Sequence, residues 1–117
     1  YESVTTGNDN KDNISKILKA NPNIRFHADI GHLNLCGRKP LEYLKHFKNK
    51  LGHIHLHDNN GMMDLHLPLG AGNIDWKTLI KELKTFYDET ITLEIFSNDR
   101  DYLILSKNKL KKLWAAQ

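Results

Sequence analysis

The stretch HIHLH at residues 53–57 decides the fold. Ile54 and Leu56 alternate there with histidines, and a period of two is typical of a strand with one aliphatic face and one imidazole face. The same alternation occurs in IRFHAD at residues 24–29 and in ITLEIF at residues 91–96. We therefore expect three strands, each with an aliphatic side and a polar side.

Helical patterns separate these strands. Apolar residues recur at helical spacing after Asn10, after Pro40, after Asp75 and over roughly residues 101–115. Pro40 suits the first position of a helix, and Asp75 suits an N-cap. Strands that alternate with helices predict a parallel sheet joined by right-handed crossovers, which is an α/β fold. A complete (β/α)₈ TIM barrel needs roughly 250 residues, so we expect the 117 residues to form a single partial barrel domain over 1–117.

The composition is that of a soluble globular chain, since 26% of the residues are charged, 39% are hydrophobic and the mean hydropathy is -0.57. No run of about 18 apolar residues is available for a membrane span, and the start YESVTTGNDN lacks the apolar core of a secretory signal. The single cysteine excludes an internal disulfide, so we expect a cytoplasmic protein. The unpaired sheet edges of a half barrel would favour a homo-oligomer.

Candidate metal ligands gather at the ends of the expected strands. Asp29, His55 and Glu94 each lie late in a strand, on the face opposite its aliphatic residues. In parallel sheets the ligand sites lie at the carboxyl ends of the strands. Carboxylate and imidazole ligands together suit Zn²⁺, Mn²⁺, Co²⁺ or Mg²⁺. Each of these residues alone is more often a hydrogen-bonding structural residue, and we expect His27 and His53, which face the barrel interior, to be hydrogen-bonded core histidines.

Four motifs follow one another along the chain: Asp29-Ile30-Gly31-His32, His55-Leu56-His57-Asp58, DLHLPLGAG at residues 64–72, and Thr92-Leu93-Glu94. Together they resemble the motifs of the xylose isomerase-like TIM-barrel superfamily, which includes sugar-phosphate isomerases and epimerases, ketose 3-epimerases and endonuclease IV. The resemblance covers about residues 24–95. It implies the carboxyl-terminal half of the barrel, about strands five to eight.

The resemblance implies a metal site made of Glu2, Asp29, His55 and Glu94. Glu2 and Glu94 would also be the catalytic acid and base, a role that the two glutamates have in the epimerases. His32 would contact the substrate or a second metal ion. His57 is also expected at the substrate, with the alternative that it orients the His55 ring. Asp64 and His66 match the D-x-H zinc pair of endonuclease IV.

The resemblance therefore implies a divalent-metal-dependent isomerase or epimerase that acts on a sugar or a sugar phosphate. Its metal ion would stabilise an ene-diolate while a carboxylate removes and returns a proton on carbon. One alternative is a zinc-dependent nuclease of the endonuclease IV type, which would cleave nucleic acid at abasic sites. The other alternative is a half barrel without catalysis.

Overall fold

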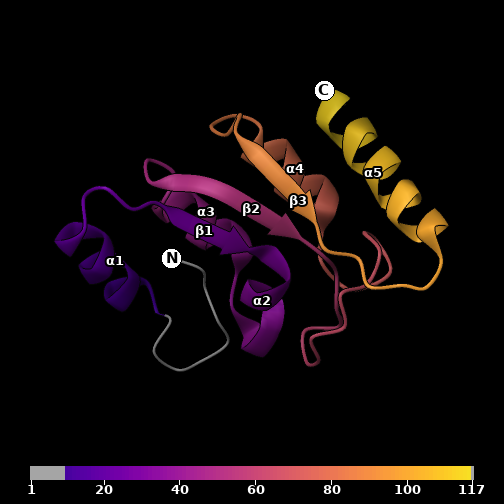
Figure 1. Ribbon diagram of the computed structural model, residues 1–117, viewed down its shortest axis with the longest axis horizontal. Helices are drawn as coiled ribbons and strands as arrows, with labels where there is room; N and C mark the ends of the chain where they lie inside the picture. Colours follow the sequence, from indigo (N-terminus) through magenta and orange to yellow (C-terminus); the bar gives the residue numbers. More distant parts are fainter. Residues whose placement is uncertain (1–9, 117) are drawn as a thin grey trace.

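The structure of the chain is a computed structural model that describes residues 10–116. Glu2, an expected metal ligand and catalytic residue, lies outside the described residues. The elements follow one another as α1 (Lys11–Ala20), β1 (Phe26–Asp29), α2 (Ile30–Asn34), the 3₁₀ turn η1 (Leu35–Gly37), α3 (Pro40–His46), β2 (Leu51–Leu56), α4 (Trp76–Leu83), β3 (Thr90–Leu93) and α5 (Arg100–Ala115). Figure 1 shows this order in colour along the chain.

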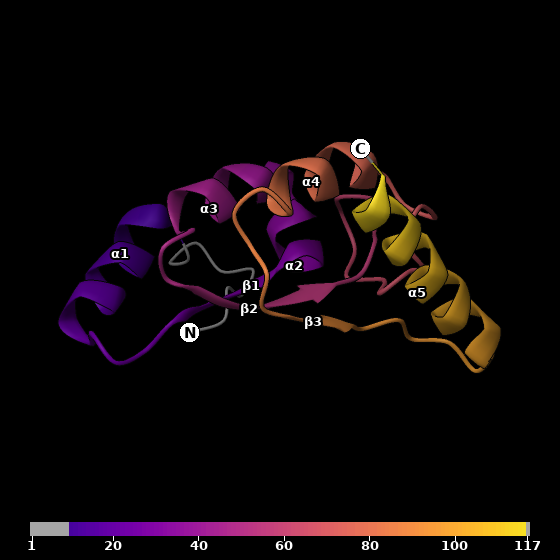
Figure 2. The ribbon, with the colours of Figure 1, turned by 90° about the horizontal axis from the view of Figure 1, so that it is seen from above.

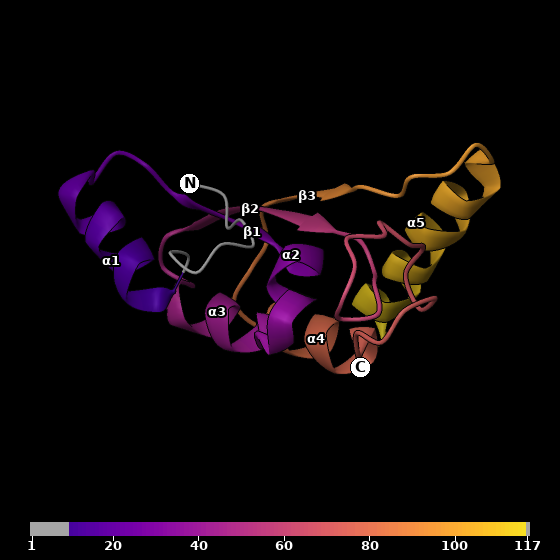
Figure 3. The same ribbon diagram turned by 90° about the horizontal axis from the view of Figure 1, so that it is seen from below.

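The three strands form one parallel sheet in the order β1-β2-β3, which confirms the α/β fold. The helices lie on one side of this sheet, as the views from above and below show (Figures 2 and 3). Along the chain each strand therefore leads into a helix that crosses back over the same face. Among residues 10–116, no helix combines the length and the apolarity that a membrane span needs.

The core lies between the sheet and the helices. The aliphatic side chains of β2, Ile54 and Leu56, are completely buried there, and they meet Ile80 and Leu83 of α4 within the same apolar cluster. Burying one such side chain stabilises a fold by about 1.5–3 kcal/mol. The alternation in the sequence thus directs the aliphatic face of the sheet towards the helices and leaves the histidine face on the other side.

Side chains at the helix starts explain where the helices begin. Asn10 accepts a hydrogen bond from the backbone N–H of Asn13 at the start of α1, and Asp75 accepts one from Thr78 at the start of α4. Pro40 occupies the first turn of α3. These starts agree with the sequence-based predictions for the three helices.

The strand ends differ from the predictions by a few residues. β2 ends at Leu56 and β3 ends at Leu93, so His57 and Glu94 each lie just beyond a strand. The backbone N–H of Glu94 nevertheless donates to the carbonyl of Leu56, which keeps Glu94 beside β2. After β1 the chain turns directly into α2, a five-residue helix whose N-cap is Asp29.

Candidate metal centre

Three of the expected metal ligands come together at the carboxyl ends of the strands, and we call Asp29, His55 and Glu94 the carboxylate centre. The sheet register places Asp29 beside His55. His55 Nδ1 lies 3.8 Å from Asp29 Oδ2 and 3.3 Å from Glu94 Oε1. Oxygen and nitrogen ligands of a divalent ion sit about 2.0–2.2 Å from it, so donor atoms at these separations fit around one ion. The donor set is therefore suited to a divalent cation.

The protein holds the Asp29 carboxylate through one oxygen, Oδ1, and the buried Oδ2 has no hydrogen-bond partner among the described residues. Its Oδ1 accepts a hydrogen bond from the backbone N–H of His32 at 3.0 Å and another from Nε2 of His57 at 2.7 Å. Burial acts to raise the pKa of Asp29, but these hydrogen bonds outweigh it and lower the pKa below its ordinary value. Asp29 is therefore ionised at neutral pH, as a metal ligand must be.

A second group of ligand-type side chains lies next to this centre, and we call it the Asp64 group: His32, Asp64 and His66. His32 Nε2 lies 3.2 Å from Asp64 Oδ2, and His66 Nε2 lies 3.1 Å from Asp64 Oδ1. His66 adopts a positive φ of 50°. Its Nδ1 lies 3.0 Å from the backbone carbonyl of Glu94, which can only accept, so Nδ1 carries the proton and Nε2 faces Asp64.

His57 connects the two groups. Its side chain is completely buried, and its ring stacks on the ring of His66 with centroids 3.7 Å apart. His66 stacks in turn on Phe96 at 4.0 Å. One nitrogen of His57 comes within 4.8 Å of oxygens of both Asp29 and Glu94. Its Nε2 donates to Asp29, and its Nδ1 has no hydrogen-bond partner among the described residues, so the expected substrate contact of His57 stays a prediction. The hydrogen bond favours a role in positioning Asp29.

Asp58 organises the loop that carries the Asp64 group. Its buried carboxylate accepts hydrogen bonds from the indole N–H of Trp76 at 2.7 Å and from the backbone N–H groups of Asn59, Gly70 and Ile74. The most distant of these donors, Trp76, is 18 residues away in the chain. From the sequence we expected Asp58, like His57, as a residue that could orient the His55 ring, whereas the printed hydrogen bonds of its carboxylate go to the loop and to Trp76. The glycine-rich stretch after it was the one available signal of such a compact loop.

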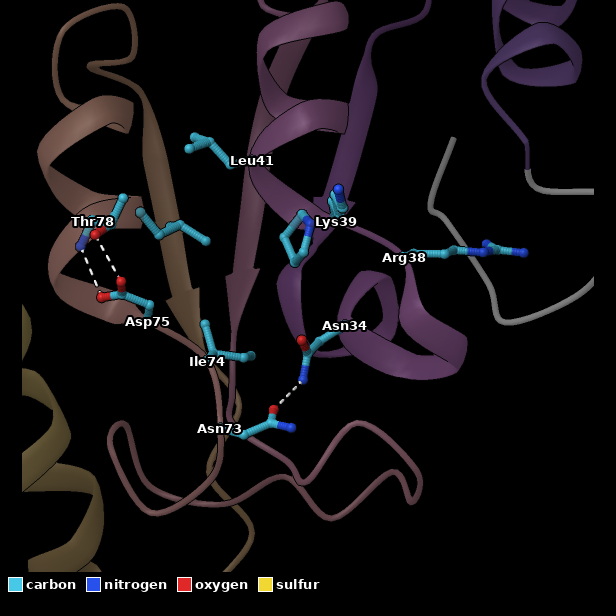
Figure 4. A pocket seen from close by; sticks show the side chains of 10 residues that line it. Asn34, Arg38, Lys39, Leu41, Asn73, Ile74, Asp75 and Thr78 are labelled. Carbon is cyan, nitrogen blue, oxygen red and sulfur yellow. Dashed lines mark hydrogen bonds between the residues drawn. The ribbon is translucent and has the colours of Figure 1, made fainter.

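A separate pocket of about 270 Å³ lies between α3 and the start of α4, on the helix side of the molecule. Figure 4 shows Asn34 and Asn73 joined by a hydrogen bond at one end and Asp75 bonded to Thr78 at the other. Of the described residues that line it, Asp75 alone is acidic and none is a histidine. This pocket therefore lacks the donor set of the carboxylate centre.

The chain is similar to proteins of one family. The family model described as xylose isomerase-like TIM barrel matches residues 2–113. Two uncharacterised proteins of Methanocaldococcus jannaschii are 39% identical over 94 residues and 34% identical over 90 residues. Each match covers 77% of this chain, whereas the chain spans only about a third of these relatives, 31% and 35% of their lengths.

Solved structures show the same fold. A D-tagatose 3-epimerase-like protein has a TM-score of 0.69 and 34% identity over 85% of this chain and 39% of its own. An L-ribulose 3-epimerase has a TM-score of 0.68 and 22% identity over 98% of this chain and 39% of its own, and at that identity it shows the fold alone. The parallel sheet and the likeness to these structures identify the chain as part of a TIM barrel. The chain belongs to the xylose isomerase-like TIM barrel family.

Proposed function

We propose that the chain provides the metal-binding part of an enzyme that isomerises or epimerises a sugar or a sugar phosphate. The observation that carries this proposal is the convergence of Asp29, His55 and Glu94 from three neighbouring strands. The similar solved structure at 34% identity is described as a D-tagatose 3-epimerase-like protein, which supports a sugar as the substrate class.

The carboxylate centre would hold one divalent ion, with Glu2 as a further ligand outside the described residues. Such an ion supplies electrophilic stabilisation of the charge that develops on the sugar oxygens when a neighbouring carbon loses its proton. Mn²⁺, Co²⁺, Zn²⁺ and Mg²⁺ all accept this mixture of oxygen and imidazole ligands.

Glu94 is the described residue that we assign to proton transfer on carbon. Its side chain is 28% exposed, whereas that of Asp29 is completely buried. It can therefore reach a bound sugar, and Glu2, outside the described residues, would serve as its partner in proton transfer. His57 holds Asp29 in place through its hydrogen bond. We assign His32 to contact with the substrate or with a second metal ion.

Deuterium exchange tests this function directly. D-Tagatose and L-ribulose are incubated with the chain and Mn²⁺ in D₂O, and proton NMR follows the signal of the hydrogen next to the carbonyl. We expect this signal to decay as deuterium enters, and we expect the Glu94→Gln variant to lose at least 100-fold in rate, the low end of general acid–base contributions.

The control is Glu89→Gln, because Glu89 lies just before the same strand but pairs with Arg25 outside the carboxylate centre. This variant should exchange at the normal rate. A Mn²⁺-loaded chain that exchanges no deuterium with ketoses or ketose phosphates would contradict the proposal.

The Asp64 group supports a second candidate, a zinc-dependent nuclease that cleaves at abasic sites. A carboxylate flanked by two imidazoles within 3.2 Å is a donor set that suits an additional zinc ion. Zinc-dependent cleavage of a duplex with one abasic site, without deuterium exchange into any ketose, would favour this candidate over the epimerase.

A further inference from the structure

A third group of ligand-type side chains lies on the open face of the sheet. Two of its members, His27 and His53, come two residues before Asp29 and His55 in their strands. We call His27, His53 and His55 the imidazole cluster. The sheet register pairs His27 on β1 with His53 on β2, and His53 with Thr90 on β3. The ring centroids are 3.9 Å apart for His27 and His55, 5.0 Å for His53 and His55, and 5.1 Å for His27 and His53. One nitrogen from each ring lies within 4.8 Å of the other two.

His27 is not the hydrogen-bonded core histidine that the sequence predicts. Its Nε2 is buried, and no hydrogen-bond partner for it exists among residues 10–116. Buried polar atoms without a partner are uncommon, and an ion is one of the groups that satisfy them. The unpaired nitrogen thus points to a ligand within the cluster.

His53 has the surroundings of a metal-binding histidine. Its Nδ1 lies 2.7 Å from Thr90 Oγ1, and its Nε2 lies 3.0 Å from Thr92 Oγ1. A histidine that binds a metal through one nitrogen usually keeps a hydrogen bond on the other. If a metal ion replaces one of these threonine hydroxyls at its ring nitrogen, the other hydroxyl keeps its hydrogen bond to the second nitrogen.

We propose that His27, His53 and His55 form a second site for a transition-metal ion such as Zn²⁺, Ni²⁺ or Co²⁺, which shares only His55 with the carboxylate centre. Three imidazole nitrogens without a carboxylate favour these ions and disfavour Mg²⁺ and Mn²⁺, which prefer oxygen ligands. A three-histidine set also leaves the fourth position of a tetrahedral ion open for water or a small ligand.

His55 belongs to both sites, and this has a consequence for binding. A neutral imidazole has one nitrogen lone pair, and the Nδ1 of His55 faces Asp29 and Glu94. A metal ion in the imidazole cluster therefore takes His55 away from the carboxylate centre. By linkage, Zn²⁺ in the cluster weakens Mn²⁺ binding in the carboxylate centre, and Mn²⁺ weakens Zn²⁺ binding by the same factor.

The test is nitrogen-15 NMR of histidine ring nitrogens during titration with Zn²⁺, on the chain labelled at histidine. The carboxylate centre is first removed by the pair of substitutions Asp29→Asn and Glu94→Gln. His27→Gln and His53→Gln variants assign the signals, and circular dichroism checks that each variant folds. The control is His46→Gln, because His46 is an exposed histidine at the end of α3 and does not belong to the cluster.

We expect Zn²⁺ to shift the ring nitrogens of His27 and His53 even without the carboxylate centre, while Mg²⁺ leaves them unchanged. His27→Gln should lower the Zn²⁺ affinity of this site at least tenfold, and His46→Gln should not change it. If Zn²⁺ shifts only His32 and His66 of the Asp64 group and leaves His27 and His53 unmoved, the proposal is overturned. This titration measures Zn²⁺ binding and not the reaction of a sugar. Its result is therefore independent of the deuterium exchange that tests the proposed function.

Discussion

Replacing Gly31 by alanine tests whether the position of the His57 ring controls the carboxylate centre. A Cβ built at Gly31 would lie 2.0 Å from Cε1 and 2.2 Å from Nδ1 of His57. These distances are far shorter than any van der Waals contact, so the ring or α2 has to move. The ring is fixed on its other sides, because Nε2 donates to Asp29 at 2.7 Å and the face stacks on His66 at 3.7 Å.

We expect this clash to change both the free energy of unfolding and the Kd for Mn²⁺. Overpacking a rigid site costs about 1–3 kcal/mol, and we expect this loss in the free energy of unfolding, measured by urea denaturation of the metal-free chain. A displaced His57 also releases Asp29. Loss of a group that orients a metal ligand lowers metal affinity about 10–100-fold, so the Kd for Mn²⁺ in a calorimetric titration should rise by that factor.

Two further variants separate the clash from a general effect of alanine. Gly37 has a positive φ of 71°, but a Cβ there meets no atom within 4 Å. Gly37→Ala should therefore cost some stability through backbone strain and leave the Kd for Mn²⁺ unchanged. In a His57→Ala background the space of the ring is free, so Gly31→Ala should cost almost no stability. Equal stability losses in both backgrounds, or an unchanged Kd in Gly31→Ala, would refute this reasoning.

Three other predictions concern the loop, the sheet face and α5. Asp58→Asn should lower the free energy of unfolding by about 3 kcal/mol, because the NH2 group that replaces one carboxylate oxygen cannot accept the hydrogen bonds made to that oxygen; a loss below 1 kcal/mol in urea denaturation would disagree. The pKa of His27 is lowered to about 4 by burial and then by His55 and His53, so between pH 6.5 and 4 the unfolded chain binds a proton that the folded chain does not. The metal-free chain should lose stability as the pH falls through this range, and His27→Gln should flatten the profile. Ser106→Ala removes the hydroxyl that accepts from the backbone N–H of Leu69 and should cost about 1 kcal/mol without changing the affinity for Mn²⁺.

The alternation of aliphatic and polar residues was sufficient to predict the sheet and to place the candidate metal ligands of the carboxylate centre at one edge of it. Alternation fixes which side of a strand a residue faces, so Asp29 and His55 were expected on the same face, and the register indeed places them side by side. Parallel strands also end at the same edge of a sheet. This is why residues that are distant in the sequence were expected to meet.

The roles of His57 and Asp58 could not be read from the sequence. His57 has the same parity as His53 and His55, but β2 ends at Leu56, so alternation no longer determines where the ring points. Its bond to Asp29 depends on the tight turn from β1 into α2, which is too short to show a helical period. The hydrogen bonds of Asp58 depend on the folded loop, and no local pattern encodes them.

The strand ends were less predictable than the strands. Residues 24–29 alternate from Ile24 onward, but β1 begins at Phe26, where the register shifts between Phe26 and His27. β3 ends before Glu94, although one further hydrogen bond from Glu94 to β2 extends the contact. Each strand begins and ends where its pairing with the neighbouring strand begins and ends. This pairing depends on the tertiary structure, so the local sequence does not predict it.

Elemental mass spectrometry of the chain after equilibration with Mn²⁺ measures whether the carboxylate centre binds a metal ion. The comparison is with a variant that carries both Asp29→Asn and His55→Ala. We predict about one Mn²⁺ per chain, bound by the oxygen-rich carboxylate centre and lost in the variant. Equal amounts of Mn²⁺ in both proteins, or none in the unaltered chain, would contradict it.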